Sequence, residues 1–268
     1  MKSIFRYFLF LLLFSCNLDN NRELQIDQSY EGEEAYWVSK SMDEHLHLAF
    51  YDLEAFKKKA FTDSLPGCPS VLFSTDSLSL TLNYDQAGCE DAGSSDFEGS
   101  IQLQYSLPSP GSNDTLQLNF QNYHQENTKI QGSRVFYIAR KRTDNKLLIE
   151  ETDSLLLVNN FGSSTRIKPR LEHQAQFQSG ALTAISSTGD MTGRNWSGNE
   201  IKVKLSKTTG DECLSSAIFR PTSGTETWTV LRTGGGNVIH ELVYSETGDC
   251  ETKTTIRLSE GVVMEKSP

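Results

Sequence analysis

The chain has 268 residues, 37% of them hydrophobic and 22% charged, and a formal net charge of −10. An acidic surface repels nucleic-acid phosphates and anionic headgroups, so nucleic acid is excluded as an expected partner. The length allows one large domain or two small ones.

The first segment is typical of an export signal. Lys2 and Arg6 supply positive charge, and an unbroken apolar run follows at residues 7–14. That run is shorter than the ~20 residues that span a bilayer. A charged start with a short apolar core therefore predicts a secretory signal peptide at residues 1–15.

The end of this segment, Leu13-Phe14-Ser15-Cys16, resembles a bacterial lipobox. The resemblance implies cleavage before Cys16 and a lipid anchor, with acyl chains such as palmitate, on its thiol. Two or more acyl chains hold a protein stably at a membrane. The partner expected here is thus the outer membrane, with the periplasmic or surface face left open. The alternative is an ordinary signal peptide that is cut elsewhere, with Cys16 as an unmodified thiol. Residues 16–31, without apolar periodicity, are interpreted as the lipidated cysteine and a flexible tether.

Residues 32–62 are predicted to form one amphipathic helix. Apolar side chains recur at steps of three and four residues, which places them on one helix face. Pro66-Gly67 stops any continuation. The apolar stripe consists of Val38, Met42, Leu46, Ala49, Leu53, Phe56 and Ala60.

From residue 66 onward the hydrophobic period changes to two. Clean alternation indicates strands with one buried and one wetted face, which is typical of antiparallel sheets. We therefore predict an all-β body, mainly antiparallel, as a sandwich or an open barrel-like sheet, behind one N-terminal helix. A first β-unit is placed at 66–170 and a second at 171–268, with one continuous domain as the alternative. The clearest alternating segments are residues 78–85, 100–106, 115–123, 200–207, 226–232, 238–245 and 254–266.

The cysteines other than Cys16 are even in number, which favours disulfides in an oxidising compartment. The preferred pairs each bracket a local run of strand-like sequence, and the other pairings remain open. Zinc is the rival, but no CxxC spacing occurs, so no metal is expected. The preferred pairs are Cys68 with Cys89 and Cys213 with Cys250.

Several short motifs in a fixed order resemble a pattern in uncharacterised lipoproteins of Bacteroidetes-type bacteria. The resemblance covers most of 66–132 and 213–261, and it implies an exported, lipid-anchored β-protein without an assigned activity. The segment 92–98 departs from it, because basic residues are common there in such proteins. The motifs are Cys68-Pro69 with Val71, the Leu-x-Leu-x-Tyr-Asp run at 80–85, Gly88-Cys89, Gly99-Ser100-Ile101, the segments 120–123 and 130–132, and the closing segment 248–261.

A smaller resemblance concerns O-glycosylation. Asp followed by Ser or Thr and an aliphatic residue is similar to the acceptor sequence of those bacteria. Ser64 and Thr115 are expected in loops and are the better candidates; unmodified turns are the alternative. The remaining candidates are Ser77 and Ser154.

The sequence holds none of the usual catalytic motifs, such as GxSxG, HExxH or a P-loop, and no cofactor is expected. Adjacent carboxylates, Glu33-Glu34 and Glu150-Glu151, are interpreted as solvent-facing. Trp196 lies in a polar, glycine-flanked stretch and is the candidate ligand contact, because an exposed indole can stack on a sugar ring. A tryptophan that folds back on the sheet is the alternative.

The preferred hypothesis is a non-enzymatic, lipid-anchored envelope protein that presents its β-body for binding or assembly, with a glycan or an envelope protein as partner. A glycan-active enzyme, with carboxylates brought together by folding, is one alternative. A carrier of a hydrophobic ligand inside a half-open barrel is the other.

Overall fold

The structure is a computed structural model that describes residues 20–75, 78–84, 97–106, 114–210, 213–214, 219–232, 236–246, 248 and 252–266, with side chains from residue 28 onward. Cys16, the signal segment, Ser77, Cys89 and Cys250 lie outside the described residues.

One long helix and a few short ones precede the strands. The long helix α2 spans Asn20–Glu44 and is followed after His45 by the 3-10 helix η2 (Leu46–Phe50). Two single-turn helices, α3 (Leu53–Phe56) and α4 (Lys59–Thr62), lead toward the sheet.

The described strands form one 14-stranded sheet, and every pair of neighbouring strands is antiparallel. Strands that follow each other in sequence are neighbours in space, so the chain runs up and down without a crossover. The strands are β1 (Ser70–Phe73), β2 (Ser79–Asn83), β3 (Phe97–Tyr105), β4 (Thr115–Gln125), β5 (Thr128–Lys141), β6 (Asn145–Glu151), β7 (Leu155–Asn159), β8 (Ser164–Gln178), β9 (Ala181–Arg194), β10 (Glu200–Thr209), β11 (Ser223–Leu231), β12 (Val238–Glu246), β13 (Thr252–Arg257) and β14 (Val263–Lys266).

Strands β6 and β7 share one position between β5 and β8. The first half of β8 pairs with β7, and the second half pairs with β6. Pro169 of β8 lies at the junction, where its carbonyl accepts a hydrogen bond from the Thr152 amide. Proline cannot donate to a sheet ladder, and this interruption is where its missing N–H costs least.

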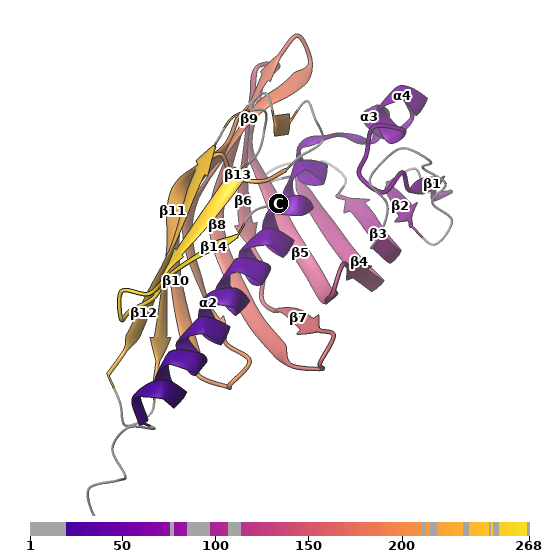
Figure 1. The fold of residues 1–268 in the computed structure, drawn as a ribbon. Coiled ribbons are helices and arrows are strands. Elements are labelled where there is room, and N and C mark those ends of the chain that lie inside the picture. The colour runs from indigo at the N-terminus through magenta and orange to yellow at the C-terminus, as the bar shows by residue number, and fades with distance from the viewer. Residues whose placement is uncertain are drawn as a thin grey trace, which may run out of the picture.

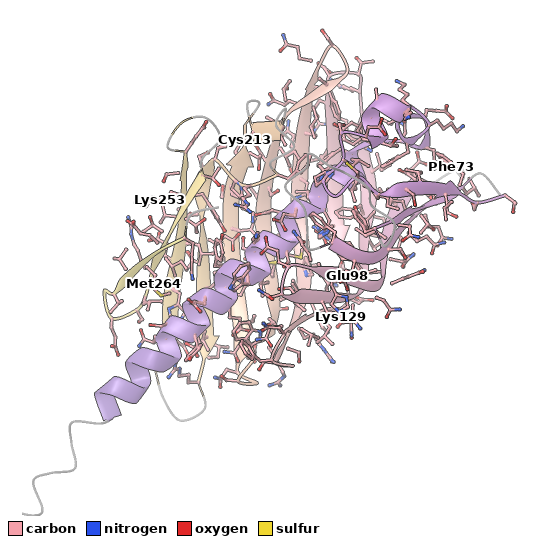
Figure 2. All side chains as sticks on the ribbon, turned by 45° about the vertical axis from the view of Figure 1, so that its right-hand side comes forward. Phe73, Glu98, Lys129, Cys213, Lys253 and Met264 are labelled. Carbon is pink, nitrogen blue, oxygen red and sulfur yellow. The ribbon has the colours of Figure 1, made fainter. Side chains whose placement is uncertain are left out.

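The sheet curves strongly, and α2 lies along its concave side (Figure 1). In the turned view the helix passes in front of the sheet, with Phe73 of β1 on one side and Lys253 and Met264 of β13 and β14 on the other (Figure 2). We call the sheet face toward α2 the inner face and the opposite one the outer face. The inner face is lined by the buried members of each alternating strand, such as Ile101 and Leu103. The predicted all-β, mainly antiparallel fold with one N-terminal helix is thereby confirmed.

The helical segment differs from the prediction in its bounds. Helix α2 begins at Asn20, inside the segment interpreted as a flexible tether, and it ends at Glu44. The predicted continuation to residue 62 is broken because the backbone is extended at Tyr51 and Asp52. The Asp52 side chain accepts a hydrogen bond from the Ala55 amide and caps a new helix, as aspartate often does at an N-cap. Ala60, at the end of the predicted stripe, is exposed.

The boundary expected between two β-units falls inside β8, and the sheet continues across it without interruption. Cys68 and Cys213 are described, and Cys213 is buried. Their preferred partners lie outside the described residues, so both disulfide pairings stay predictions.

Candidate functional site

The contact between α2 and the inner face contains a layer of polar and charged side chains. The strands place cations and carboxylates on the inner face, beside their apolar residues. Helix α2 places carboxylates and hydroxyl groups opposite them. We call this set the inner polar layer. Its main members are Glu31, Glu34, Ser39, Asp43, Arg134, Glu150, Thr165, His173, Ser187, Lys207, Glu226 and His240, all of them buried.

Lys207 of β10 is the centre of one cluster in this layer. Its Nζ donates to Asp43 Oδ2 at 2.7 Å, to Glu226 Oε1 at 2.6 Å and to Ser39 Oγ at 3.0 Å. Burial alone would lower the pKa of Lys207, but Asp43 and Glu226 raise it above its usual value. Burial raises the pKa of Asp43 to about 6, against the opposing effect of Lys207. The cluster joins the helix to the sheet through charges that are shielded from water.

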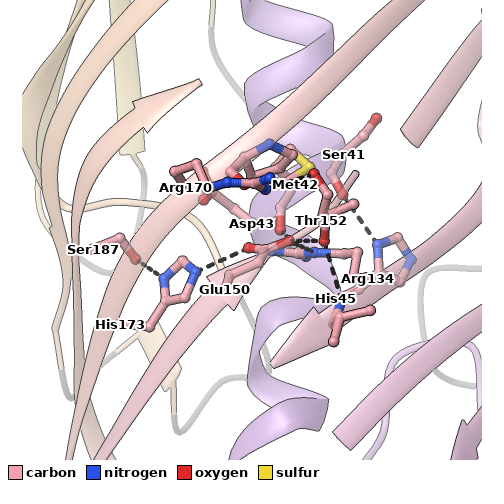
Figure 3. Close-up of polar contacts among 12 residues, drawn as sticks. Ser41, Met42, Asp43, His45, Arg134, Glu150, Thr152, Arg170, His173 and Ser187 are labelled. Carbon is pink, nitrogen blue, oxygen red and sulfur yellow. Dashed lines mark hydrogen bonds and ion pairs between the residues drawn. The ribbon is translucent and has the colours of Figure 1, made fainter. Parts of the chain in front are cut away.

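A second cluster surrounds Glu150 of β6 (Figure 3). Arg134 of β5 holds both carboxylate oxygens, with Nε and Nη2 each 2.8 Å from an oxygen, and its Nη1 donates to the Met42 carbonyl of α2 at 2.7 Å. Burial would raise the pKa of Glu150, but Arg134 and then His173 lower it to about 2. Glu150 is therefore ionised, and its fork-shaped pairing with arginine is the strong, bidentate kind.

His173 links Glu150 to Ser187. The His173 Nε2 lies 3.0 Å from Glu150 Oε2, and its Nδ1 lies 2.8 Å from Ser187 Oγ. Burial lowers the pKa of His173. A neutral ring that donates to the carboxylate accepts the serine proton at its other nitrogen.

The Ser187–His173–Glu150 order is that of a nucleophile, a base and an orienting carboxylate. Two observations count against chemistry there. Arg134 already neutralises Glu150 by the double hydrogen bond. The adjoining cavity measures about 10 Å³, which is room for about one water and not for a substrate. The arrangement serves the packing of α2 on the sheet.

The middle of α2 carries two more buried carboxylates. Glu31 Oε2 lies 2.9 Å from Arg232 Nη2 and 3.1 Å from His240 Nε2, and these partners lower its pKa in spite of burial. Glu34 forms no ion pair with a described residue, and burial raises its pKa to about 7. Its Oε1 accepts hydrogen bonds from the Thr165 hydroxyl and from the Trp196 amide, the latter at 2.8 Å.

Trp196 belongs to the turn between β9 and β10. The turn is closed by hydrogen bonds between Asn195 and Asn199, including Asn199 N to Asn195 Oδ1 at 2.8 Å. Gly198 supports it with a φ of +80°, which glycine adopts readily. The Glu34 contact fixes this turn to α2.

An open groove of about 690 Å³ lies on the outer face beside this turn, and we call it the outer groove. It is formed where β7, β8, β9 and β10 meet the turn, so all of its strands are neighbours in the sheet. Its lining is polar and includes cations. The lining residues that the argument uses are Arg166, Lys168, Arg194, Asn195, Trp196 and Glu200.

Among the sequence-derived candidate residues that the structure describes, Trp196 is half-buried and lines the outer groove. Ser64 is exposed in a turn after α4, as expected. Thr115 is the first residue of β4 and half-buried, so its expected place in a loop is wrong. Ser154 is exposed between β6 and β7. These serine and threonine residues lie on separate elements and form no common site.

The interpretation of Glu34 and Glu150 as solvent-facing is wrong, because both are buried. A signal was available in the strands. Glu150 stands two residues after Leu148, and Lys207 two after Leu205, so period-two alternation places each on the buried face. The alternation alone does not predict their burial, because charged side chains are rarely buried unless they are paired.

Within the described residues, no group of His, Cys, Asp and Glu side chains is arranged to hold a metal ion. No helix in that part of the chain is both long enough and apolar enough to cross a membrane. Comparisons of the chain with protein-family models, with curated proteins and with solved structures found no match.

Proposed function

We propose that this chain is a non-enzymatic, lipid-anchored protein of the cell envelope that binds its ligand or partner on the outside of the curved sheet. The observation that carries the proposal is the position of α2. The helix occupies the concave side, where a half-open barrel would otherwise hold a substrate or a lipid.

The space left under α2 supports this assignment. The cavities beside the inner polar layer measure about 10 to 20 Å³, too little for a sugar or an acyl chain. The buried carboxylates beneath the helix are engaged with arginine, lysine or hydroxyl groups, whereas a glycosidase pair faces an open cleft. The outer groove, at about 690 Å³, is larger than these cavities.

An anchor on Cys16 would lie close in sequence to the helix. Asn20, where α2 begins, is the fourth residue after Cys16. Four residues reach at most ~14 Å when fully extended. A lipid on Cys16 would therefore hold the folded body close to the membrane.

The anchor is tested by labelling cells with an alkyne analogue of palmitate, followed by capture of the protein. Wild type and the matched control Ser15→Ala, which keeps a small residue before the cysteine, should carry the label and sediment with membranes. Cys16→Ser should carry no label and should be recovered in the soluble fraction. Label on Cys16→Ser, or none on wild type, would overturn the anchor.

The side of the outer membrane on which the body lies is tested separately by protease treatment of intact cells. Digestion of the wild-type body while a periplasmic control survives would place the body on the surface. Protection until the outer membrane is opened would place it in the periplasm.

A further inference from the structure

We propose that the outer groove binds an anionic saccharide, with Arg166, Lys168 and Arg194 holding the acidic group and Trp196 stacking on a sugar ring. The proposal deepens the proposed function, because it names a ligand class for the outer face.

The cations of the groove are set against one another by the sheet register. Arg166 of β8 lies directly opposite Arg194 of β9, and Lys168 stands two residues along the same face of β8. Directly opposite residues have Cβ atoms about 5 Å apart, and like charges in such a pair are destabilising. The fold gains nothing from this arrangement.

None of the described carboxylates forms an ion pair with these three cations. Neither Arg166 nor Lys168 forms an ion pair with a described residue. Arg194 donates to the Gly198 carbonyl at 2.9 Å, which orients it but does not neutralise it. Glu200 is opposite Arg194 on β10, without an ion pair within 4.0 Å. In a chain with a net charge of −10, unpaired cations gathered in one groove indicate a bound anion.

The wall beside the cations is preorganised for a sugar. The backbone of Trp196 is held by its amide on Glu34 and by the closed turn around it, so the position of the residue beside the cations is set before a ligand binds. Asn195 is 4% exposed and lines the groove, and its Nδ2 has no hydrogen-bond partner among the described residues. A flat aromatic face and an amide donor are the usual contacts of a sugar ring and its hydroxyls.

The combination points to one chemical class. Guanidinium groups bind carboxylate and phosphate by paired hydrogen bonds. An inorganic anion would use the arginines but leave Trp196 without a role, and a neutral sugar would leave the arginines unpaired. Glu200 at the rim disfavours a ligand with acidic groups on every unit. A saccharide with one separate acidic group, either a phosphate or a uronic acid, can pair with the arginines and also place a sugar ring against Trp196.

Isothermal titration calorimetry of the purified body, with residues 1–15 removed, tests the proposal. The probes are an oligosaccharide with a single uronic acid unit among neutral sugars, a mannose phosphate, a neutral maltooligosaccharide of matched length and inorganic phosphate. We expect one of the two acidic saccharides to bind at least tenfold more tightly than both the neutral saccharide and inorganic phosphate. Which one binds distinguishes carboxylate from phosphate. Affinity should fall as salt is raised, since the contact is ionic.

Variants assign the binding to this groove. Arg166→Gln with Lys168→Gln should weaken binding at least tenfold, and Trp196→Ala should do the same while Trp196→Tyr recovers part of the loss. Lys204→Gln is the matched control, because Lys204 is exposed on the same face of β10 but lies outside the groove lining. Circular dichroism confirms that each variant is folded.

The proposal is overturned if both acidic saccharides bind no better than the neutral one or than phosphate. It is also overturned if Lys204→Gln weakens binding as much as the groove variants do. Either failure leaves the palmitate labelling unaffected, so it is distinguishable from a failure of the proposed function.

Discussion

The Nζ atom of Lys207 lies 2.7 Å from Oδ2 of Asp43, and this buried ion pair joins strand β10 to helix α2. Both side chains are more than nine-tenths buried. Breaking a buried pair costs more than the pair itself contributes, because the remaining charge is stranded away from water.

Lys207→Met should therefore destabilise the protein by about 3 to 5 kcal/mol, since Asp43 and Glu226 lose their shared cation. Urea unfolding measures the change. It is done at pH 8 because protonation of Asp43 and Glu226, which would remove their charge, is disfavoured at that pH. Lys204→Met, on the outer face of the same strand, should stay within about 0.5 kcal/mol of wild type. Equal losses in the two variants would contradict the central place of Lys207.

Glu34 should make stability depend on pH in the neutral range. Its pKa is raised from 4.5 to about 7 by burial, so the native state binds a proton that the unfolded state releases. Stability from this group is present below pH 4.5 and is lost as the pH rises through 7. The loss amounts to about 3 kcal/mol when a full shift of this size is converted.

Glu34→Gln keeps an oxygen for Thr165 and for the Trp196 amide but cannot ionise. Relative to wild type, its free energy of unfolding should rise between pH 5 and pH 8. A difference between the two proteins that does not change with pH would show that Glu34 titrates normally.

Glu150→Gln should cost about 3 to 5 kcal/mol at pH 7, because it leaves the Arg134 guanidinium buried without its carboxylate. Glu150 has its pKa lowered to about 2, so its stabilisation is present above pH 4.5 and fades as the pH falls through 2. The gap between variant and wild type should therefore shrink in acid. Glu151→Gln, one residue further on and exposed, is the control and should be close to neutral.

Gly189→Ala should destabilise the sheet by roughly 1 to 3 kcal/mol, the usual cost of a strained backbone position. Gly189 has a φ of +136°, and a Cβ atom there would lie 2.4 Å from the Arg170 carbonyl oxygen. Gly236→Ala is the control, because nothing lies within 4 Å of its Cβ position. Thermal unfolding of the two variants compares them, and a similar melting temperature in both would refute the steric argument.

Non-reducing peptide mapping should recover Cys68 linked to Cys89, and Cys213 linked to Cys250. Replacing either pair by serines should cost about 2 to 5 kcal/mol, the range for native disulfides in exported domains. Peptides that join Cys68 to Cys213 or to Cys250 would show a different connectivity.

Much of the fold could be predicted because period-two patterning is local. Leu80, Leu82, Ile101 and Leu103 were placed on a buried face by alternation alone, and all four are buried. The end of the long helix was predicted less well. Asp52 indicates the break before α3, since aspartate favours an N-cap over a helix interior.

The candidate site was predicted only in part. The polar, glycine-flanked surroundings of Trp196 predict a ligand contact, and the residue lines the outer groove. Arg166 and Arg194 were not chosen, because they are 28 positions apart in the numbering and only the register of β8 on β9 sets them opposite each other.

The sequence by itself determined which side chains share a face, since a strand turns successive residues to opposite sides whatever its neighbours are. It also determined at which strand positions a cation or a carboxylate replaces an apolar residue on the buried face. Only the tertiary structure decided which of them meet. The curvature of the sheet and the position of α2 across its concave side bring Lys207 to Asp43 and Glu34 to the Trp196 turn. These contacts join residues more than 150 positions apart, and no local pattern encodes a distance of that kind.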